Sequence, residues 1–183
     1  MKIIPRLIHV KFIKRYKRFF ADVILNKKKV TTHCPNSGSM LGLINENNDA
    51  WISISDNPNR KLKYTLEIIN DKKSNVGVNT HRANRIVEKA LQTKKIVELK
   101  KFTNIKREAK FSKETRFDFL LENENKKVFL EVKNVTLSRE KGISEFPDAV
   151  TVRGKKHLVH LQDAIKKGYE SYLLFLIQRE DIK

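Results

Sequence analysis

Residues 116–133, RFDFLLENENKKVFLEVK, constrain the fold of this chain more than any other stretch. Apolar and polar side chains alternate with a period of two on both sides of the polar segment 123–126, which predicts two strands, 115–122 and 127–135, joined by a tight turn. The asparagines in that segment tolerate the backbone angles that such a turn requires. The stretch therefore predicts an antiparallel hairpin.

The length of the turn also predicts which side chains face each other. If residues 123–126 form the loop, Glu122 pairs with Lys127, and counting back places Asp118 opposite Glu131. Opposed carboxylates about 4.5–5.5 Å apart repel each other, whereas a divalent cation between them would make the pairing favourable. Lys133 shares the face of Glu131 and can orient a water molecule or stabilise developing charge. We interpret the trio as a candidate site for metal-assisted phosphodiester cleavage, with Asp118 and Glu131 binding Mg²⁺ or Mn²⁺.

The alternative interpretation is an ordinary strand with a charged, solvated face, because Glu-Val-Lys is common in strands. The predicted order of elements favours the metal site. A helix near residues 80–91, strands near 105–111, 115–122 and 127–135, a helix at 151–167 and a buried strand at 171–177 follow one another. This is the core order of restriction-endonuclease-like nucleases, which carry Asp and Glu-x-Lys on the second and third strands.

Glu88 lies on the first predicted helix, and it is a further candidate ligand for the metal, although a solvated helix residue is the alternative. The start of the second predicted helix carries Arg153, Lys156 and His157, which we expect to contact backbone phosphates.

The charge of the chain favours a polyanionic partner. Its 39 Lys and Arg against 21 Asp and Glu give a formal net charge of +18, which predicts binding to nucleic acid, above all to DNA with little sequence specificity. RNA is allowed equally by the charge. The abundance of Lys together with Asn and Ile is also what codon bias in an AT-rich genome produces, so a merely basic protein is the alternative.

A membrane location is not expected. No apolar run approaches the roughly 20 residues that span a bilayer, and the N-terminus lacks the pattern of a signal peptide. Cys34 is the one cysteine, which excludes an internal disulfide and fits a reducing cytoplasm. Cys34 and His33 have no second Cys/His pair at ligand spacing, so zinc is not expected.

Up to residue 80 the patterns predict short strands with polar turns, near 8–13, 19–25, 29–33, 50–55 and 62–70. Five such strands favour a small barrel of the OB type. We therefore expect two domains in an α+β chain: an OB-like nucleic-acid-binding domain at 1–80 and a restriction-endonuclease-like domain at 81–183.

Three segments of the first domain are candidate contacts for nucleic acid. The first mixes cations with an aromatic ring, the second is a turn-forming loop whose amides could form an anion nest, and the third is a basic turn. A solvated loop is the alternative for each. The candidate residues are Lys14, Arg15, Tyr16, Lys17 and Arg18; Asn36, Ser37 and Ser39; and Arg60 and Lys61.

Seven segments in order, over nearly the whole chain, resemble the sugar fermentation stimulation protein A (SfsA) family. They are KRYKRFFADV (14–23), HCPNSGSM (33–40), SDNPNRKLKYTLE (55–67), VNTHRANRIVEKAL (78–91), RFDFLL (116–121), EVKNVTL (131–137) and FPDAVTVRGKKHL (146–158). The resemblance implies an N-terminal OB-like domain, a nuclease-like C-terminal domain, DNA binding and a link to the regulation of sugar-utilisation genes.

Two departures from the family pattern stand out. Val152 occupies a position where the resemblance implies a polar residue, and the chain ends at Lys183, where family members are expected to continue. The leading hypothesis is a cytoplasmic DNA-binding protein with a nuclease-type metal site. The alternatives are a non-catalytic DNA-binding transcriptional regulator and an RNA-binding protein.

Overall fold

The computed structural model describes residues 6–149 and 151–182, except for the side chain of Arg153. The chain forms two compact units. The barrel unit comprises Met1–Arg82, Asn134–Ala149 and Ile177–Lys183, and the sheet unit comprises Ala83–Lys133 and Val150–Leu176. The chain first passes from the barrel unit to the sheet unit between Arg82 and Ala83, close to the predicted boundary after residue 80. The later segments 134–149 and 177–182 were expected in the second domain, and they group with the barrel unit instead.

The barrel unit contains six strands, ordered β3-β2-β1-β4-β5-β6. They are β1 (Ile8–Tyr16), β2 (Phe20–Leu25), β3 (Lys28–His33), β4 (Asp49–Ile54), β5 (Tyr64–Asn70) and β6 (Asn75–Gly77). A parallel contact between His33 of β3 and Thr65 of β5 closes the sheet on itself. The predicted OB-type barrel is confirmed, because five of the six strands form the closed ring.

The period-two pattern of the sequence explains this barrel. Side chains that alternate along the strands fill its interior, and Phe12, Ile52, Leu66 and Ile69 are completely buried. The turns between the first three strands need left-handed backbone, which Lys17 and Arg18 adopt in the first turn and Asn26 and Lys27 in the second.

The end of the chain is fastened to the barrel unit by a buried arginine. The Arg179 guanidinium pairs with Asp71 at 2.9 Å and with Asp181 at 2.8 Å, and it donates a hydrogen bond to the Thr136 carbonyl at 2.9 Å. The N–H of Gly77 donates to the carbonyl of Gln178 at 2.9 Å. These bonds explain why residues 134–149 and 177–182 group with the barrel.

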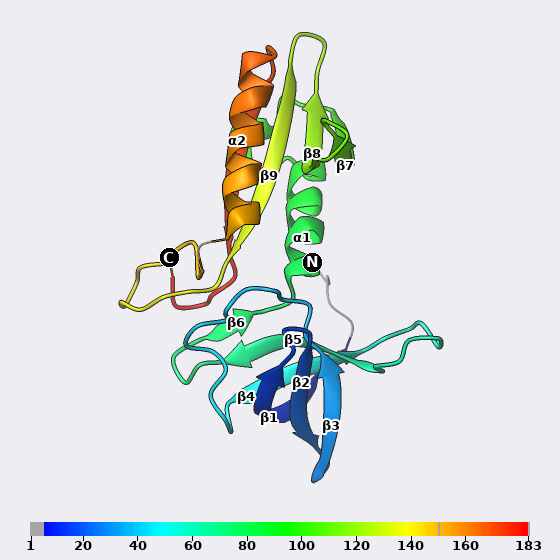
Figure 1. Ribbon diagram of the computed structural model, residues 1–183, viewed down its shortest axis with the longest axis vertical. Helices are drawn as coiled ribbons and strands as arrows, with labels where there is room; N and C mark the ends of the chain where they lie inside the picture. Colours follow the sequence, from blue (N-terminus) through cyan, green and yellow to red (C-terminus); the bar gives the residue numbers. More distant parts are fainter. Residues whose placement is uncertain (1–5, 150, 183) are drawn as a thin grey trace. The chain divides into compact units, whose positions relative to one another are not determined.

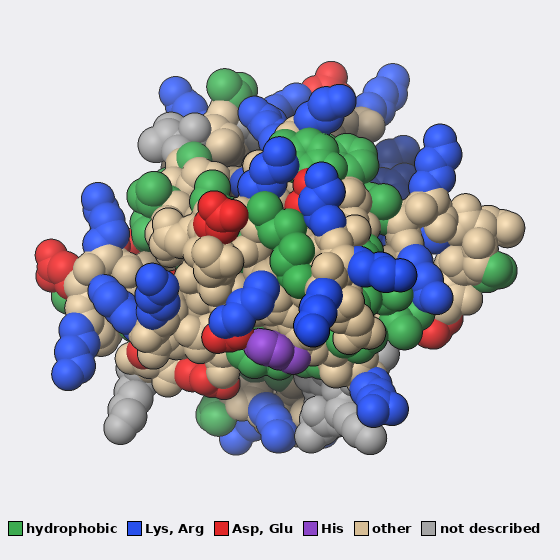
Figure 2. All heavy atoms as spheres, turned by 90° about the horizontal axis from the view of Figure 1, so that it is seen from below, with side chains coloured by type: hydrophobic (Ala, Val, Ile, Leu, Met, Phe, Trp, Pro, Cys, Tyr) green, Lys and Arg blue, Asp and Glu red, His purple; other side chains and the backbone are tan. Residues whose placement is uncertain are grey.

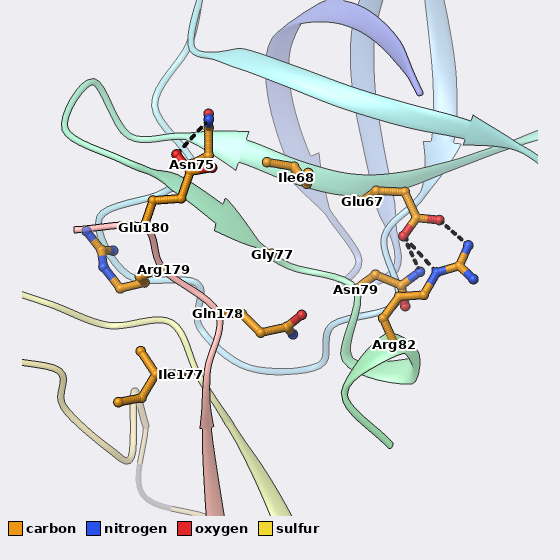
Figure 3. A pocket seen from close by; sticks show the side chains of 10 residues that line it. All are labelled: Glu67, Ile68, Asn75, Gly77, Asn79, Arg82, Ile177, Gln178, Arg179 and Glu180. Atoms are coloured by element: carbon orange, nitrogen blue, oxygen red, sulfur yellow. Dashed lines mark hydrogen bonds and ion pairs between the residues drawn. The ribbon is translucent and has the colours of Figure 1, made fainter. Parts of the chain in front are cut away.

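A surface pocket of about 250 Å³ lies beside this fastening (Figure 3). On one side Glu67 is bonded to Asn79 and Arg82, and on the other Asn75 donates to Glu180 at 2.9 Å. The charged side chains of the lining are therefore held by neighbours in the same unit, which indicates a structural role.

The sheet unit has the predicted order of helix, three strands, helix and strand. Its elements are α1 (Thr80–Gln92), whose first residues belong to the barrel unit, the short 3-10 helix η1 (Val97–Leu99), β7 (Asn104–Lys110), β8 (Arg116–Glu122), β9 (Lys127–Val135), α2 (Val152–Lys166) and β10 (Glu170–Ile177). The strands are ordered β10-β9-β8-β7, and both helices run alongside β8 and β9 (Figure 1). The restriction-endonuclease-like order predicted from the sequence is confirmed.

Each helix packs against its own apolar cluster. The first cluster joins α1 to β8 and β9 through Ala83, Val87, Phe119, Leu121 and Leu130. The second joins α2 to the same strands through Leu161, Ala164, Phe117 and Phe129. Phe119 and Leu121 supply the first cluster and Leu120 the second, as alternation between faces predicts, whereas Phe117 belongs to the second cluster although it lies two residues before Phe119.

The hairpin has the predicted register. Glu122 pairs with Lys127 and Phe119 pairs with Leu130. This ladder ends at the Phe119–Leu130 pair, and Asp118 and Glu131 are the next residues of the two strands. Among the described residues, no helix is long and apolar enough to cross a membrane.

Candidate metal centre and nucleic-acid contacts

Among the described residues, Glu131 on β9 is the most buried charged group of the sheet unit, with 4% of its surface exposed. Its Oε1 accepts a hydrogen bond from Lys133 Nζ at 2.7 Å and also pairs with His157 Nδ1 from α2. Its Oε2 is buried, and within the described part of the chain it has no hydrogen-bond partner. A buried carboxylate oxygen without a partner is costly, so it requires an explanation.

Asp118 on β8 is held from two sides. Its Oδ1 accepts a hydrogen bond from Asn84 Nδ2 of α1 at 2.7 Å, and its Oδ2 accepts the N–H of Val132 at 2.7 Å. The Asp118 side chain thus accepts the N–H of Val132, which in a regular antiparallel pair would donate to a backbone carbonyl of the neighbouring strand. These bonds fix the carboxylate beside the one on β9.

The two carboxyl groups differ in their electrostatics. Burial and the nearby charge of Glu131 raise the pKa of Asp118 above its ordinary value, against the opposing bonds from Val132 and Asn84. Burial alone would also raise the pKa of Glu131, but hydrogen bonds with His157 and Lys133 outweigh it and lower that pKa. The negative charge of Glu131 therefore makes ionisation of the neighbouring Asp118 less favourable.

This arrangement fits a hard divalent cation. Two carboxylates from adjacent strands are near enough for Glu131 to raise the pKa of Asp118, and Glu131 Oε2 is a buried acceptor without a partner among the described residues. Within residues 6–149 and 151–182 no group of three or more His, Cys, Asp or Glu side chains could hold a metal. Mg²⁺ nevertheless keeps several waters and commonly binds through only one or two carboxylates.

The structure brings Asp118, Glu131 and Lys133 together, but not Glu88. The Glu88 carboxylate pairs with the Arg107 guanidinium of β7 at 3.2 Å. Asn84 lies one helical turn earlier and reaches Asp118 instead. Glu88 therefore lies on the helix that contacts Asp118, one turn beyond the residue that makes the contact, and its role as a metal ligand stays a prediction.

Two residues that contact the carboxylates were missed or misassigned. Asn84 borders the apolar stripe of α1 in the sequence, and this was the only available signal for it. His157 was expected to contact phosphate, but it pairs with Glu131. Lys156 beside it is exposed and pairs with Glu114 at 2.8 Å, and the side chain of Arg153 lies outside the described residues.

The first predicted basic segment contains both exposed and structural residues. Lys14, Lys17 and Arg18 are exposed. The Arg15 guanidinium instead donates to the carbonyls of Asn36 at 2.6 Å and Gly38 at 2.8 Å. Backbone acceptors of the next loop therefore engage Arg15, and its contact with phosphate stays a prediction.

Tyr16 also has partners within the barrel. Its hydroxyl donates to Asp22 at 3.2 Å, and its ring stacks on Phe20 with centroids 5.5 Å apart. It is half-buried, so it offers less ring surface to a base than the sequence suggested.

The predicted anion nest at residues 35–40 does hold an anion, but the anion is supplied by the chain itself. The Asp148 Oδ2 accepts the N–H of Met40 at 3.1 Å and the Ser39 hydroxyl at 3.2 Å. A methyl group on Gly38 would come within 2.6 Å of the same oxygen. Asn36 is buried and bonded within the barrel unit, whereas Ser37 and Ser39 are exposed, Ser39 with its hydroxyl bonded to Asp148.

In the third candidate segment Lys61 is exposed, whereas Arg60 is half-buried. The Arg60 guanidinium donates to Thr65 Oγ1 at 2.9 Å and to His33 Nδ1 at 2.7 Å.

Figure 2 shows Lys and Arg side chains spread over one face, among hydrophobic and acidic groups, without a single continuous basic stripe.

Two family models match this chain. Residues 13–78 match the model described as the SfsA N-terminal OB domain, and residues 81–183 match the sugar fermentation stimulation protein RE domain. A sugar fermentation stimulation protein homolog from Pelagibacter ubique is 58% identical over 182 residues, covering 100% of this chain and 78% of the relative. A homolog from Caulobacter vibrioides is 42% identical, covering 96% and 74%.

A solved structure is also similar. It is the Pyrococcus furiosus SfsA in complex with Ca²⁺, with a TM-score of 0.89 and 23% sequence identity. The similarity covers 98% of this chain and 76% of that one. At this identity the likeness concerns the fold.

Proposed function

The chain belongs to the sugar fermentation stimulation protein family, and on that premise we propose that it binds DNA and cleaves phosphodiester bonds with a divalent cation. Asp118 and Glu131 would hold Mg²⁺ or Mn²⁺, and Lys133 would act on the attacking water. The observation that carries the proposal is the buried, unpartnered Glu131 Oε2 beside Asp118. The Ca²⁺ of the solved relative supports a divalent cation.

The neighbours of the carboxylates prepare them for this role. Lys133 and His157 both engage Glu131 Oε1, which fixes the group and leaves Oε2 as the oxygen for a cation. Asn84 and the Val132 N–H fix Asp118 in the same way. Such bonds to ligand side chains set their orientation. A bound cation would polarise the phosphate and lower the pKa of a bound water.

Lys133 carries the charge that suits the reaction. It lies two residues from Glu131 on the same face of β9, and its side chain is largely shielded from solvent, with 14% exposed. An ammonium in such a place can orient a water or stabilise the negative charge that develops on a phosphate. Its contact with Glu131 holds it at the candidate metal centre.

DNA as the substrate is supported by charge. The net charge of +18 attracts a polyanion without reading its sequence. Lys14, Lys17, Arg18 and Lys61 are exposed on the barrel unit, and barrels of this type commonly bind nucleic acid.

A second candidate is DNA binding without cleavage, in which the protein acts on transcription. The absence of a three-residue metal cluster among the described residues favours it, and the family name links it to sugar utilisation. RNA binding is a variant of this candidate, and a competition between matched RNA and DNA separates the two.

The test is a cleavage assay on supercoiled plasmid, linear duplex and single strands, with Mn²⁺, Mg²⁺ or a chelator. The wild type should cut only with a cation, and Glu131→Gln should lose at least about two orders of magnitude in rate. Glu124→Gln, in the exposed turn of the same hairpin, is the matched control and should cut normally. A folded wild type that shifts DNA but never cuts it would establish the non-catalytic candidate.

A further inference from the structure

Three basic side chains of the barrel unit lie together although they come from different parts of the sequence. His33 ends β3, Arg60 lies in the connection between β4 and β5, and His81 lies in the first turn of α1. The Arg60 guanidinium reaches His33 Nδ1 at 2.7 Å, and the rings of His33 and His81 have centroids 6.5 Å apart.

The described residues provide no acidic partner for this cluster. In the part of the chain that the structure describes, no carboxylate forms an ion pair with His33, Arg60 or His81. Burial, the Arg60 charge and the nearby His81 lower the pKa of His33. The Arg60 charge thus lies beside a histidine whose protonation it disfavours, with no counter-ion among the described residues, and a bound anion would supply one.

The hydrogen-bond pattern defines what His33 can offer. Arginine only donates, so His33 Nδ1 must accept, and the ring is neutral with its hydrogen on Nε2. The Nε2–H of His33 therefore remains available to donate to a ligand. The Arg60 guanidinium has five N–H groups, of which it uses some to donate to Thr65 and His33, and it is only half-buried. Both groups have donors left for a ligand.

The backbone around His81 is held firmly. The N–H of His81 donates to the Asn79 side chain at 3.1 Å, and Asn79 and Arg82 are both bonded to the buried Glu67 (Figure 3). The exposed ring of His81 thus projects from a fixed helix start. Preorganised donors lose little conformational freedom on binding, which favours a small, multiply charged anion.

We propose that His33, Arg60 and His81 form a phosphate-binding site on the barrel unit. The site is built from other residues than the candidate metal centre. It depends on the proposed function only for nucleic acid as the source of the phosphate, because guanidinium and imidazole donors suit phosphate oxygens in any such ligand.

The test uses NMR of the full chain, because its five histidines give separate imidazole signals, two from the proposed site and three that serve as controls. Inorganic phosphate is titrated at constant ionic strength while the imidazole signals are followed. The signals of His33 and His81 should shift saturably, and those of His9, His157 and His160 should not. Uniform shifts of all five, or no shift of the two, would overturn the site.

Matched variants separate specific binding from net charge. Arg60→Gln should weaken phosphate binding about tenfold or more, whereas Lys63→Gln, which removes one charge nearby in the sequence, should not. Equal loss in both variants would count against the site. Arg60→Gln also removes the tether of His33, so His81→Gln is the second variant, since its ring has no side-chain hydrogen bond in the described structure. It should show the same loss.

Two further arms identify the source of the phosphate and separate this site from the proposed function. A short single-stranded DNA is titrated with a 5′-hydroxyl end and with a 5′-phosphate end. If both DNAs shift the signals of His33 and His81, the site binds backbone phosphates. If only the DNA with the 5′-phosphate shifts them, the site binds a terminal phosphate. If DNA moves other signals but not these two, the site fails while DNA binding stands. If only inorganic phosphate moves the two, DNA binding fails while the site stands.

Discussion

Each unit of this protein buries one glutamate, and the two glutamates are satisfied to different degrees. Glu67 in the barrel unit is 2% exposed and Glu131 in the sheet unit is 4% exposed. Both Glu67 oxygens have partners, namely Ser53 at 2.6 Å, Asn79 at 2.8 Å and Arg82 at 2.8 Å. In contrast, the partners of Glu131 all engage Oε1 and leave Oε2 without one.

The contrast separates a structural ion pair from a prepared ligand. For both groups burial alone would raise the pKa, and in both the hydrogen bonds outweigh burial and lower it. The carboxylates therefore stay ionised in both places, but only the one on β9 keeps a buried oxygen available. Low exposure and a shifted pKa do not distinguish the two roles, whereas counting partners for each oxygen does.

The largest expected effect is on the barrel. Glu67→Gln leaves Arg82 without its buried countercharge, so we expect a loss of about 3–5 kcal/mol in the free energy of unfolding. Trp51 on β4 is the single tryptophan and reports the barrel unit, so urea unfolding followed by its fluorescence measures the change. Glu131→Gln without divalent cations also breaks the pair with Lys133, but it relieves the repulsion with Asp118, so it should cost clearly less. A similar loss in both variants would remove the contrast.

The second effect is stabilisation by a cation. At a concentration 100 times its Kd, Mg²⁺ or Mn²⁺ should stabilise the wild type by about 2.7 kcal/mol, because it binds only the folded site. Glu131→Gln should lose this effect and Glu67→Gln should keep it in whatever fraction remains folded. Calorimetry with and without the cation makes the measurement. Equal stabilisation of wild type and Glu131→Gln would place the cation elsewhere.

The hairpin shows how far the sequence alone could lead. Its alternation and the four-residue turn predicted the register, which places Asp118 and Glu131 just beyond the last pair of the ladder, because these are local properties of one hairpin. The sequence could not predict which helix residues reach the pair, since this depends on packing between distant segments. The contacts of Asn84 and His157 are therefore evident only in the structure, where Glu88, one turn after Asn84, is bonded to Arg107.

The same limit applies to the basic segments. Composition predicted a surface for a polyanion, but it does not distinguish an exposed cation from one that ties down a loop. Arg15 donates to two carbonyls 21 and 23 positions away along the chain, and the Asp148 carboxylate fills the loop that was expected to bind an external anion. Both contacts join segments whose proximity is a property of the folded barrel.

A smaller effect concerns acid. The pKa of Glu67 is lowered on folding, so its contribution to stability is present above its usual value of 4.5 and is lost as the pH falls through the lowered pKa. Ser53→Ala removes one of the bonds that lower this pKa. In the variant the loss should begin at a higher pH than in the wild type, as measured by Trp51 fluorescence during acid unfolding. Identical acid profiles would show that the Ser53 bond does not set this pKa.

The smallest expected effect is at a third glutamate, Glu88, which tests the sequence prediction against the structure. Its pair with Arg107 is partly exposed, with 25% and 44% of the two side chains accessible, so Glu88→Gln should cost only about 0.2–1 kcal/mol. The stabilisation by Mg²⁺ or Mn²⁺ should persist in full, because Glu88 bonds to β7 rather than to the carboxylate pair. If calorimetry instead showed that the variant loses the cation effect as Glu131→Gln does, Glu88 would be a ligand after all. The unpartnered oxygen of Glu131 would then be one part of a three-carboxylate site, assembled by a movement of α1.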